Sequence, residues 1–133
     1  MKKIPAEPIL PTEPLYHYIS QRGVMPGAKK LEQFRAALRL RATPQLGAQE
    51  NNGDEALVHV KLFDPTGSAT WYLTEWDGED QVFSWVEGMA YPEYGYASLE
   101  ELAFTPGRMG IGIEIDTHFL PTAIGPFKNK ITC

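Results

Sequence analysis

The segment that most constrains this fold is residues 69–87, where two β-rich runs flank the polar sequence DGED. Aromatic and β-branched residues favour strands, and Asp-Gly between two such runs is a strong signal for a β-hairpin. A two-residue turn would place Glu75 opposite Asp80, a like-charge pair that costs stability and would make the pair a candidate site. We therefore expect a four-residue turn, which pairs Trp76 with Gln81.

Other segments predict further strands. In residues 55–63 every second residue is apolar, so we expect this set, Ala56, Val58, Val60 and Leu62, to face the core. Residues 94–97 are expected to form a bent or edge strand, because a proline and a glycine lie beside and within them. The last strand is expected at residues 111–118.

Two helices are predicted. Residues 28–41 carry apolar residues at helical spacing, between Pro26-Gly27 and Thr43-Pro44. The opposite face of this first helix is expected to carry the charged residues Lys30, Glu32, Arg35 and Arg39. A short helix should follow Ser98, which is a good N-cap with Glu101 three residues on as a capping box.

These elements predict an α+β fold: one domain, with an antiparallel β-meander of four to five strands packed with one long N-terminal helix and one short inserted helix. A chain of 133 residues fits one core. We assign residues 28–121 to this domain, residues 1–27 to a proline-rich arm and residues 122–133 to an irregular tail.

The arm has a proline at every third position from Pro5 to Pro14. This spacing matches a polyproline II helix, which could be a ligand for a proline-binding groove. The arm also contains large apolar residues, which favour the alternative that it lies on its own domain. These are Ile4, Ile9, Leu10, Leu15, Tyr16 and Tyr18.

Composition limits the function classes. The formal net charge of −5 argues against binding along a phosphate backbone, so we do not expect nucleic acid as a partner. Residues 29–41 nevertheless hold five basic residues against one acid, so charge is segregated along the chain. No apolar run approaches the roughly 20 residues of a membrane helix. Because Cys133 is the single cysteine, no internal disulfide can form, and we expect a cytoplasmic protein.

Four blocks occur in a fixed order: GDEALVHVKLFDP, TWYLTEWDGED, GYASLEEL, and a closing IEID segment followed by HFLP. Over about residues 34–121 they resemble the bacterial domain-of-unknown-function family 2958. The chain departs from the family pattern at Ala97, where the family has an aromatic residue, and in its closing strand. The resemblance implies a compact domain carried by plasmids and integrative elements, and it implies no established activity.

The hairpin offers the main candidate site. A turn with four acids within six positions is most often a solvated turn, but it can also be an acidic docking surface or, more rarely, a metal or catalytic site. Tryptophan and tyrosine dominate protein interfaces, so we expect a non-enzymatic surface for a protein partner. Its candidate binding residues are Trp71, Tyr72, Glu75, Trp76, Asp77, Glu79, Asp80 and Tyr96.

We assign no catalytic residue, metal ligand or cofactor, because the chain lacks recognisable nucleophile and phosphate-binding motifs. The leading hypothesis is an accessory protein of a mobile element, with an anti-defence inhibitor as its sharper form. The alternative is a small metal-dependent hydrolase that uses Glu75, Asp77 or Asp80 with residues of the last strand, namely Glu114, Asp116 and His118. The edge strand near residues 94–97 could pair with the same strand of a second copy and give a homo-oligomer. We expect a monomer or a weak homodimer.

Overall fold

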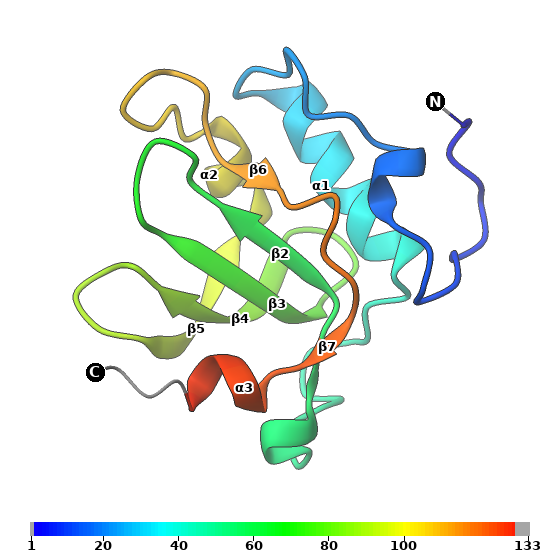
Figure 1. The fold of residues 1–133 in the computed structure, drawn as a ribbon, viewed down its shortest axis with the longest axis vertical. Helices are drawn as coiled ribbons and strands as arrows, with labels where there is room; N and C mark the ends of the chain where they lie inside the picture. Colours follow the sequence, from blue (N-terminus) through cyan, green and yellow to red (C-terminus); the bar gives the residue numbers. More distant parts are fainter. Residues whose placement is uncertain (1, 130–133) are drawn as a thin grey trace.

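A computed structural model describes residues 2–129 as a five-stranded antiparallel sheet with helices on both faces (Figure 1). The strand order is β5-β4-β3-β2-β6. The strands are β2 (Val60–Phe63), β3 (Thr70–Trp76), β4 (Gln81–Glu87), β5 (Glu93–Ser98) and β6 (Glu114–Ile115). A separate two-stranded ladder pairs β1 (Leu57–Val58) with β7 (Thr122–Ala123). The prediction of a single α+β domain is confirmed.

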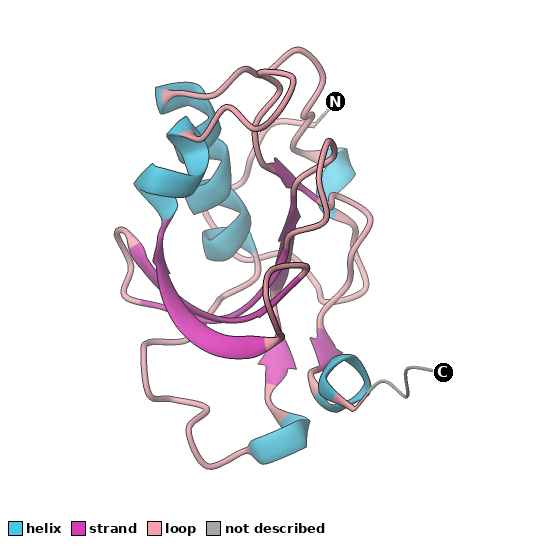
Figure 2. Ribbon diagram, turned by 90° about the vertical axis from the view of Figure 1, so that its left-hand side faces the viewer, coloured by secondary structure: helices cyan, strands magenta, loops and turns pink. Residues whose placement is uncertain are grey.

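The helices divide between the two faces of the sheet. The long helix α1 (Ala28–Leu40) and the short helix α2 (Leu99–Phe104) lie together in the hollow of the curved sheet (Figure 2). The helix α3 (Gly125–Lys128) and the 3₁₀ turn η2 (Gly53–Glu55) lie beyond the opposite face. A second 3₁₀ turn, η1, spans Leu15–His17 in the N-terminal arm.

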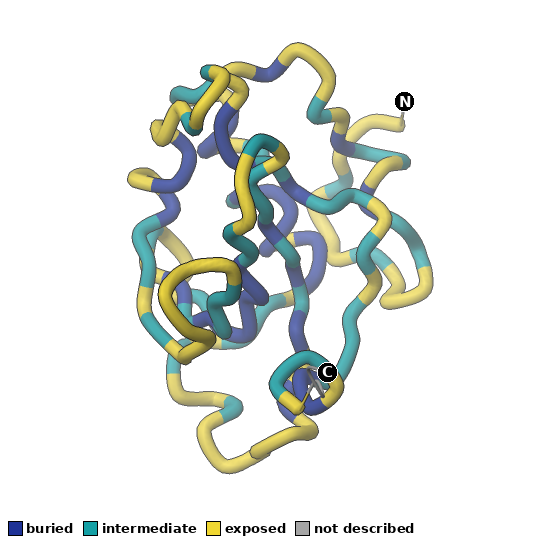
Figure 3. Tube along the Cα trace, turned by 60° about the vertical axis from the view of Figure 1, so that its left-hand side comes forward, coloured by how far each residue is buried: buried dark blue, intermediate teal, exposed yellow. Residues whose placement is uncertain are grey.

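Two apolar clusters fill the two faces, and buried positions gather in the middle of the molecule (Figure 3). The inner cluster joins α1 and α2 to the sheet through residues such as Phe34, Leu73 and Leu99. The outer cluster consists of Ala56, Val58, Tyr72 and Ile124, with Trp85, Phe119 and Phe127 packed against it. The alternation predicted for residues 55–63 is confirmed, but its residues serve different clusters, because the chain passes from the outer ladder to the main sheet at His59.

The N-terminal arm is docked on the domain. Leu15 and Ile19 lie in the inner core with 1% and 2% of their surface exposed. The Ile9 amide donates to the Leu40 carbonyl at 2.9 Å, at the end of α1. The arm therefore lies on its own domain, which is the second of the two alternatives drawn from the sequence.

The predicted irregular tail is wrong for residues 122–128, which form β7 and α3. Ile124 is fully buried, and the Phe127 ring stacks on Tyr72 with 4.4 Å between ring centroids. The prolines and glycines of this segment led to the prediction of irregular structure, although Ile124 and Phe127 anchor it by apolar contacts. Residues 130–133 of the predicted tail lie outside the described residues.

Two buried cations, Lys30 and Arg41, bind backbone carbonyls of the N-terminal arm, the Gly-rich loop and the segment before β7. The prediction that Lys30 lies on the polar face of its helix is wrong: it is fully buried, and its Nζ donates to the Ile111 carbonyl at 2.8 Å. Burial lowers the pKa of this ammonium. The guanidinium of Arg41 is buried too, and it donates to the carbonyls of Leu10 and Phe119, both at 3.3 Å.

The predicted hairpin register is wrong by one residue. Trp76 pairs with Val82, and Glu75 pairs with Phe83, so neither the Trp76–Gln81 pair nor the Glu75–Asp80 pair forms. Residues 77–80 do connect β3 to β4 as expected, but the Asp77 side chain organises this turn and the Asp77 amide donates to the Gln81 carbonyl at 3.0 Å, which shifts the pairing.

The predicted strand 111–118 is reduced to β6. Gly110 and Gly112 adopt φ of 73° and 86°, which interrupts extended backbone. A Cβ at Gly112 would lie 2.8 Å from Pro26 Cγ and 3.0 Å from the Thr105 carbonyl oxygen, so the chain passes too close to its neighbours for a side chain. Ile111, at the start of the predicted strand, is 37% exposed.

Because Leu15 is buried and Leu10 is 69% exposed, the arm offers a matched test of its docking. Leu15→Ala should lower the free energy of unfolding by about 2–5 kcal/mol, since it leaves a cavity in the core. Leu10→Ala should change it by less than about 0.5 kcal/mol. Urea denaturation of the two variants measures both values, and equal effects would contradict a docked arm.

Candidate functional site

Two acids of the hairpin turn, Asp77 and Asp80, accept hydrogen bonds from backbone amides of their own fold. Asp77 Oδ1 accepts hydrogen bonds from the amides of Glu79, Asp80 and Gln81 at 2.8, 2.9 and 3.1 Å. These bonds, led by that from Glu79, lower the pKa of the Asp77 carboxyl. The carboxylate therefore closes the turn, and the turn is further tied to α1 by a 2.8 Å bond from Arg35 Nε to the Glu79 carbonyl.

Asp80 holds the start of α2. Its Oδ2 accepts from the Ser98 hydroxyl at 2.7 Å, and its Oδ1 accepts from the Glu100 amide at 2.8 Å. Ser98 Oγ in turn accepts from the Glu101 amide at 3.2 Å, so the predicted N-cap is confirmed. The hairpin turn thus supplies a second cap to a helix that follows it by 18 residues.

Glu75 is a buried carboxylate, with only 4% of its surface exposed. Its Oε1 accepts from the Gly47 amide and its Oε2 from the Gln49 amide, both at 2.7 Å. Hydrogen bonds to a charged group are stronger than neutral ones, so this carboxylate fixes the loop that follows α1 against β3.

The eight residues of the predicted docking surface do not share one exposed face. Trp71 and Tyr72 are 7% and 5% exposed, and Glu75 is buried beside them. Trp76 and Asp80 are half-buried, so among the eight candidates only Asp77, Glu79 and Tyr96 are exposed. The sequence gives the type and spacing of these residues, but it does not show that three of the carboxylates face amides of their own chain.

A β-bulge reorganises the face that remains open. The ladder between β3 and β4 shifts between Leu73 and Glu75, so Thr74 is the extra residue. After the bulge Glu75 lies opposite Phe83, on the same side of the sheet as that ring, and Trp76 returns to the inner side. Bulges often occur beside binding sites, where they redirect a side chain.

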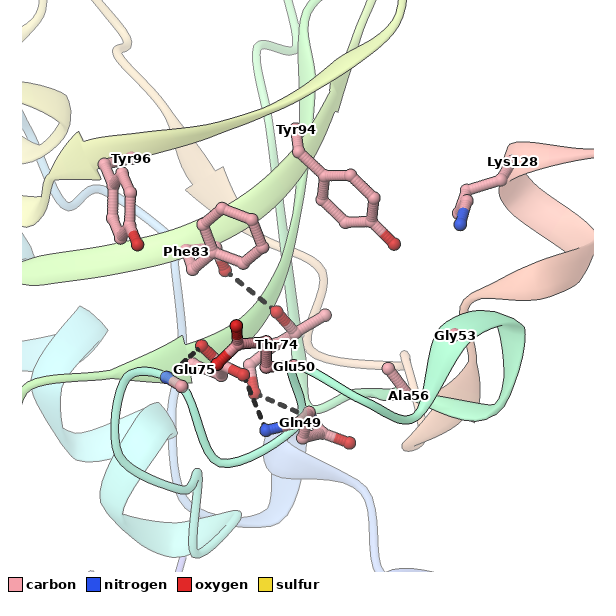
Figure 4. Close-up of a pocket in the computed structure, with 11 residues that line it drawn as sticks. Gln49, Glu50, Gly53, Ala56, Thr74, Glu75, Phe83, Tyr94, Tyr96 and Lys128 are labelled. Atoms are coloured by element: carbon pink, nitrogen blue, oxygen red, sulfur yellow. Dashed lines mark hydrogen bonds between the residues drawn. The ribbon is translucent and has the colours of Figure 1, made fainter.

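On this outer face lies a groove of about 480 Å³ (Figure 4). One wall is a row of aromatic rings, in which Phe83 stacks on Tyr94 with 5.2 Å between centroids and contacts Tyr96 at 4.9 Å. The other wall is the loop of residues 47–53, and the floor includes Thr74 and Glu75. We call this space the aromatic groove.

Lys128 closes one end of the aromatic groove. Its Nζ lies 5.0 Å from the centroid of Tyr94 and 6.0 Å from that of Trp85, and 3.1 Å from Asp54 Oδ1. The hydrogen bond to Asp54, followed by that to Tyr94, raises the pKa of this lysine. The last described helix therefore presents a cation to the aromatic wall from within the chain.

The aromatic groove borders an open edge of the sheet. β5 is the terminal strand of its sheet and pairs only with β4 among the described strands. Its residues Tyr94 and Tyr96 are 37% and 62% exposed. An edge strand carries a row of backbone groups that can pair with another chain. The predicted edge strand is thus confirmed, and its aromatic residues form part of the groove.

The acids of the predicted last strand lie elsewhere. Glu114, Asp116 and His118 line a different cavity with Lys61, whose Nζ is 3.6 Å from Asp116 Oδ2. The His118 ring packs on Tyr16 at 4.7 Å. Within residues 2–129, no three histidine, cysteine, aspartate or glutamate side chains are grouped so that they could hold a metal ion. The hydrolase alternative stays a prediction without a shared site for its residues.

The fold and groove define a small α+β domain with an aromatic cleft beside a sheet edge. The profile of a family described as protein of unknown function (DUF2958) matches residues 31–125, and the chain belongs to this family. The resemblance stated from the sequence is confirmed. Comparison with curated proteins and with solved structures gave no match. No helix in the described part of the chain is long and apolar enough to cross a membrane.

Glu75 and Glu79 give a matched pair within one motif. Glu75→Gln puts an NH₂ group against one of two backbone amides, so it should lower the free energy of unfolding by about 1–3 kcal/mol. Glu79→Gln should be nearly neutral, because its exposed carboxylate has no hydrogen-bond partner among residues 2–129. Chemical denaturation at neutral pH distinguishes the two, and similar values would contradict the structural role of Glu75.

Asp77 predicts a pH dependence of stability. Its pKa is lower in the folded state than in the unfolded chain, so its contribution is present above the unfolded pKa, about 3.9, and is lost as pH falls through the folded pKa. The difference in unfolding free energy between the wild type and Asp77→Asn should therefore be largest above about pH 5 and shrink toward about pH 2. Denaturation at several pH values measures it, with Glu79→Gln as the control for loss of a charge. A constant difference would contradict this role.

Proposed function

We propose that this chain is a non-enzymatic protein-binding module that adds an extended segment of a partner to the edge of β5 and receives its side chains in the aromatic groove. The observation that carries the proposal is the position of the groove. It lies directly beside the strand whose outer backbone edge has no partner among the described residues.

The geometry suits this mode of recognition. Strand addition takes affinity from backbone hydrogen bonds and specificity from pockets that accept alternate side chains. Tyr94 and Tyr96 are two apart on β5, so both point to the outer face and flank the position of a partner side chain. Six residues of β5 offer an edge of roughly 20 Å, which is enough for a short extended segment.

The edge also lacks the usual protection against pairing. Natural edge strands are often blocked by a proline, a lysine or an inward-pointing charge. β5 contains no proline and no lysine, and its single charged residue, Glu93, is at its first position. An open edge beside exposed aromatic rings is typical of an interaction site.

The wider setting is part of the same proposal. The family resemblance favours an accessory role in a bacterial mobile genetic element, with a cytoplasmic partner encoded by the host or by the element. An anti-defence inhibitor is one protein of this kind. Its acidic surface would engage the partner through β5 and the groove, rather than through Trp71 and Tyr72, which are buried.

Tyr96 and Tyr91 provide a matched test. They are 62% and 65% exposed, but only Tyr96 lines the groove, whereas Tyr91 lies in the loop before β5. Peptides selected on the wild type from a random displayed library should bind Tyr96→Ser at least about 10-fold more weakly, which corresponds to about 1.4 kcal/mol. Binding to Tyr91→Ser should change by less than about 2-fold, or about 0.4 kcal/mol.

Hydrogen exchange locates the bound peptide. Amides of β5 should become protected when a selected peptide binds, because they pair with it. Equal loss of affinity in both tyrosine variants, or binding without protection of β5, would contradict strand addition. Protection of β5 at high protein concentration without peptide, with a dimer mass in light scattering, would instead identify a second copy of the chain as the occupant.

A further inference from the structure

We propose that the side chain received by the aromatic groove is a cation, an arginine or lysine of the bound segment. This inference rests on the proposed function, because it names the chemistry of the segment that β5 would pair with. Three features of the groove carry it: the aromatic wall, the carboxylate wall and the charge of the surrounding surface.

The aromatic wall already holds one cation. The faces of aromatic rings attract cations within about 6 Å of the ring centroid. Lys128 lies at such distances from Tyr94 and Trp85, at 5.0 and 6.0 Å. It occupies only one end of the ring row, and Phe83 and Tyr96 continue the wall beyond it. The open part of the groove repeats the environment in which the chain places its own ammonium group.

The opposite wall supplies negative charge. Glu50 lines the groove, is exposed, and has no ion-pair or hydrogen-bond partner for its carboxylate among residues 2–129. Glu75 adds a second carboxylate at the floor, although the amides of Gly47 and Gln49 bind its oxygens. A guanidinium or ammonium group between the two walls would contact the faces of the aromatic rings and form an ion pair with Glu50, which has no such partner among residues 2–129.

A neutral apolar side chain fits this groove less well. It would contact the rings, but it would also exclude water from Glu50 without offering a hydrogen bond, and desolvating an unpaired charge is costly. The groove therefore discriminates by charge as well as by shape.

Charge segregation places the groove in an acidic region. Residues 1–41 contain eight lysines and arginines against three acids, whereas residues 42–133 contain four against fourteen. All residues that line the groove belong to the second part. The basic helix α1 lies on the opposite face of the sheet, so its charge does not cancel the field at the groove.

A second hollow continues the groove along β5. It has a volume of about 310 Å³ and shares Tyr96 with the aromatic groove. Its acidic residues include Asp77 and Glu101, of which Glu101 has no side-chain partner among the described residues. A segment paired with β5 would thus meet acids at both sides of Tyr96, which favours a sequence with more than one basic residue.

The test reads amino-acid preference from a displayed library of random nine-residue peptides. Selection on the wild type should enrich arginine and lysine at one or more alternate positions, by at least about 5-fold over the unselected library, equivalent to about 1 kcal/mol. Selection on Glu50→Gln should reduce that enrichment by at least half. Glu55→Gln removes an exposed acid that does not line the groove, so it should leave the preference unchanged. Thermal melts confirm that the variants are folded.

A selected peptide then allows a direct comparison of charge. Replacing its enriched arginine by citrulline, a neutral analogue of nearly the same shape, should weaken binding at least about 10-fold, and raised salt should weaken the arginine peptide more than the citrulline peptide. Enrichment of peptides without basic preference, still lost in Tyr96→Ser, would overturn this inference and leave the proposed function intact. Failure of any peptide to be enriched over a blank surface would overturn both.

Discussion

The open face of this domain depends on two hydrogen bonds, which the amides of Gly47 and Gln49 donate to the Glu75 carboxylate. The β-bulge at Thr74 turns Glu75 outward, and the two amides then bring the loop after α1 over the sheet. Without this loop the aromatic row would be a flat, exposed patch instead of one wall of a groove. A single buried charge therefore shapes the concavity and contributes to its negative potential.

The local elements of this fold could be predicted because each has a signal within a few residues. The helix α1 follows a clear apolar periodicity between Pro26-Gly27 and Thr43-Pro44, α2 begins at a capping serine, and the β3–β4 hairpin follows from its Asp-Gly turn. The features that were missed depend on contacts distant in sequence. The bulge, the shortened β6 and the ordered segment 122–128 are each set by partners elsewhere in the chain.

The candidate site shows the same division. The sequence identified an unusual concentration of acids and aromatic rings, and Tyr96 does line the groove. The sequence could not show which way each side chain points. Asp77 closes a turn and Asp80 caps a helix. Trp71 and Tyr72 lie in two apolar clusters on opposite faces of the sheet. Glu50 and Lys128, which complete the groove, lie outside the hairpin: Glu50 is in the loop after α1, and Lys128 is in the segment predicted as an irregular tail. No local pattern joins such residues, because only the folded chain brings them together.

The ladder between β1 and β7 has a consequence for how the chain reaches this structure. Leu57 of β1 pairs with Ala123 of β7, and Leu62 of β2 pairs with Ile115 of β6, so both early strands are completed by residues made much later. Contacts of such separation slow folding, because a long loop must close before they form. During synthesis, α1 and the central hairpin would emerge with the outer cluster still uncovered and Tyr72 in contact with water. The interval before residues 113–124 arrive is therefore the stage at which this chain is most exposed to aggregation and to proteases.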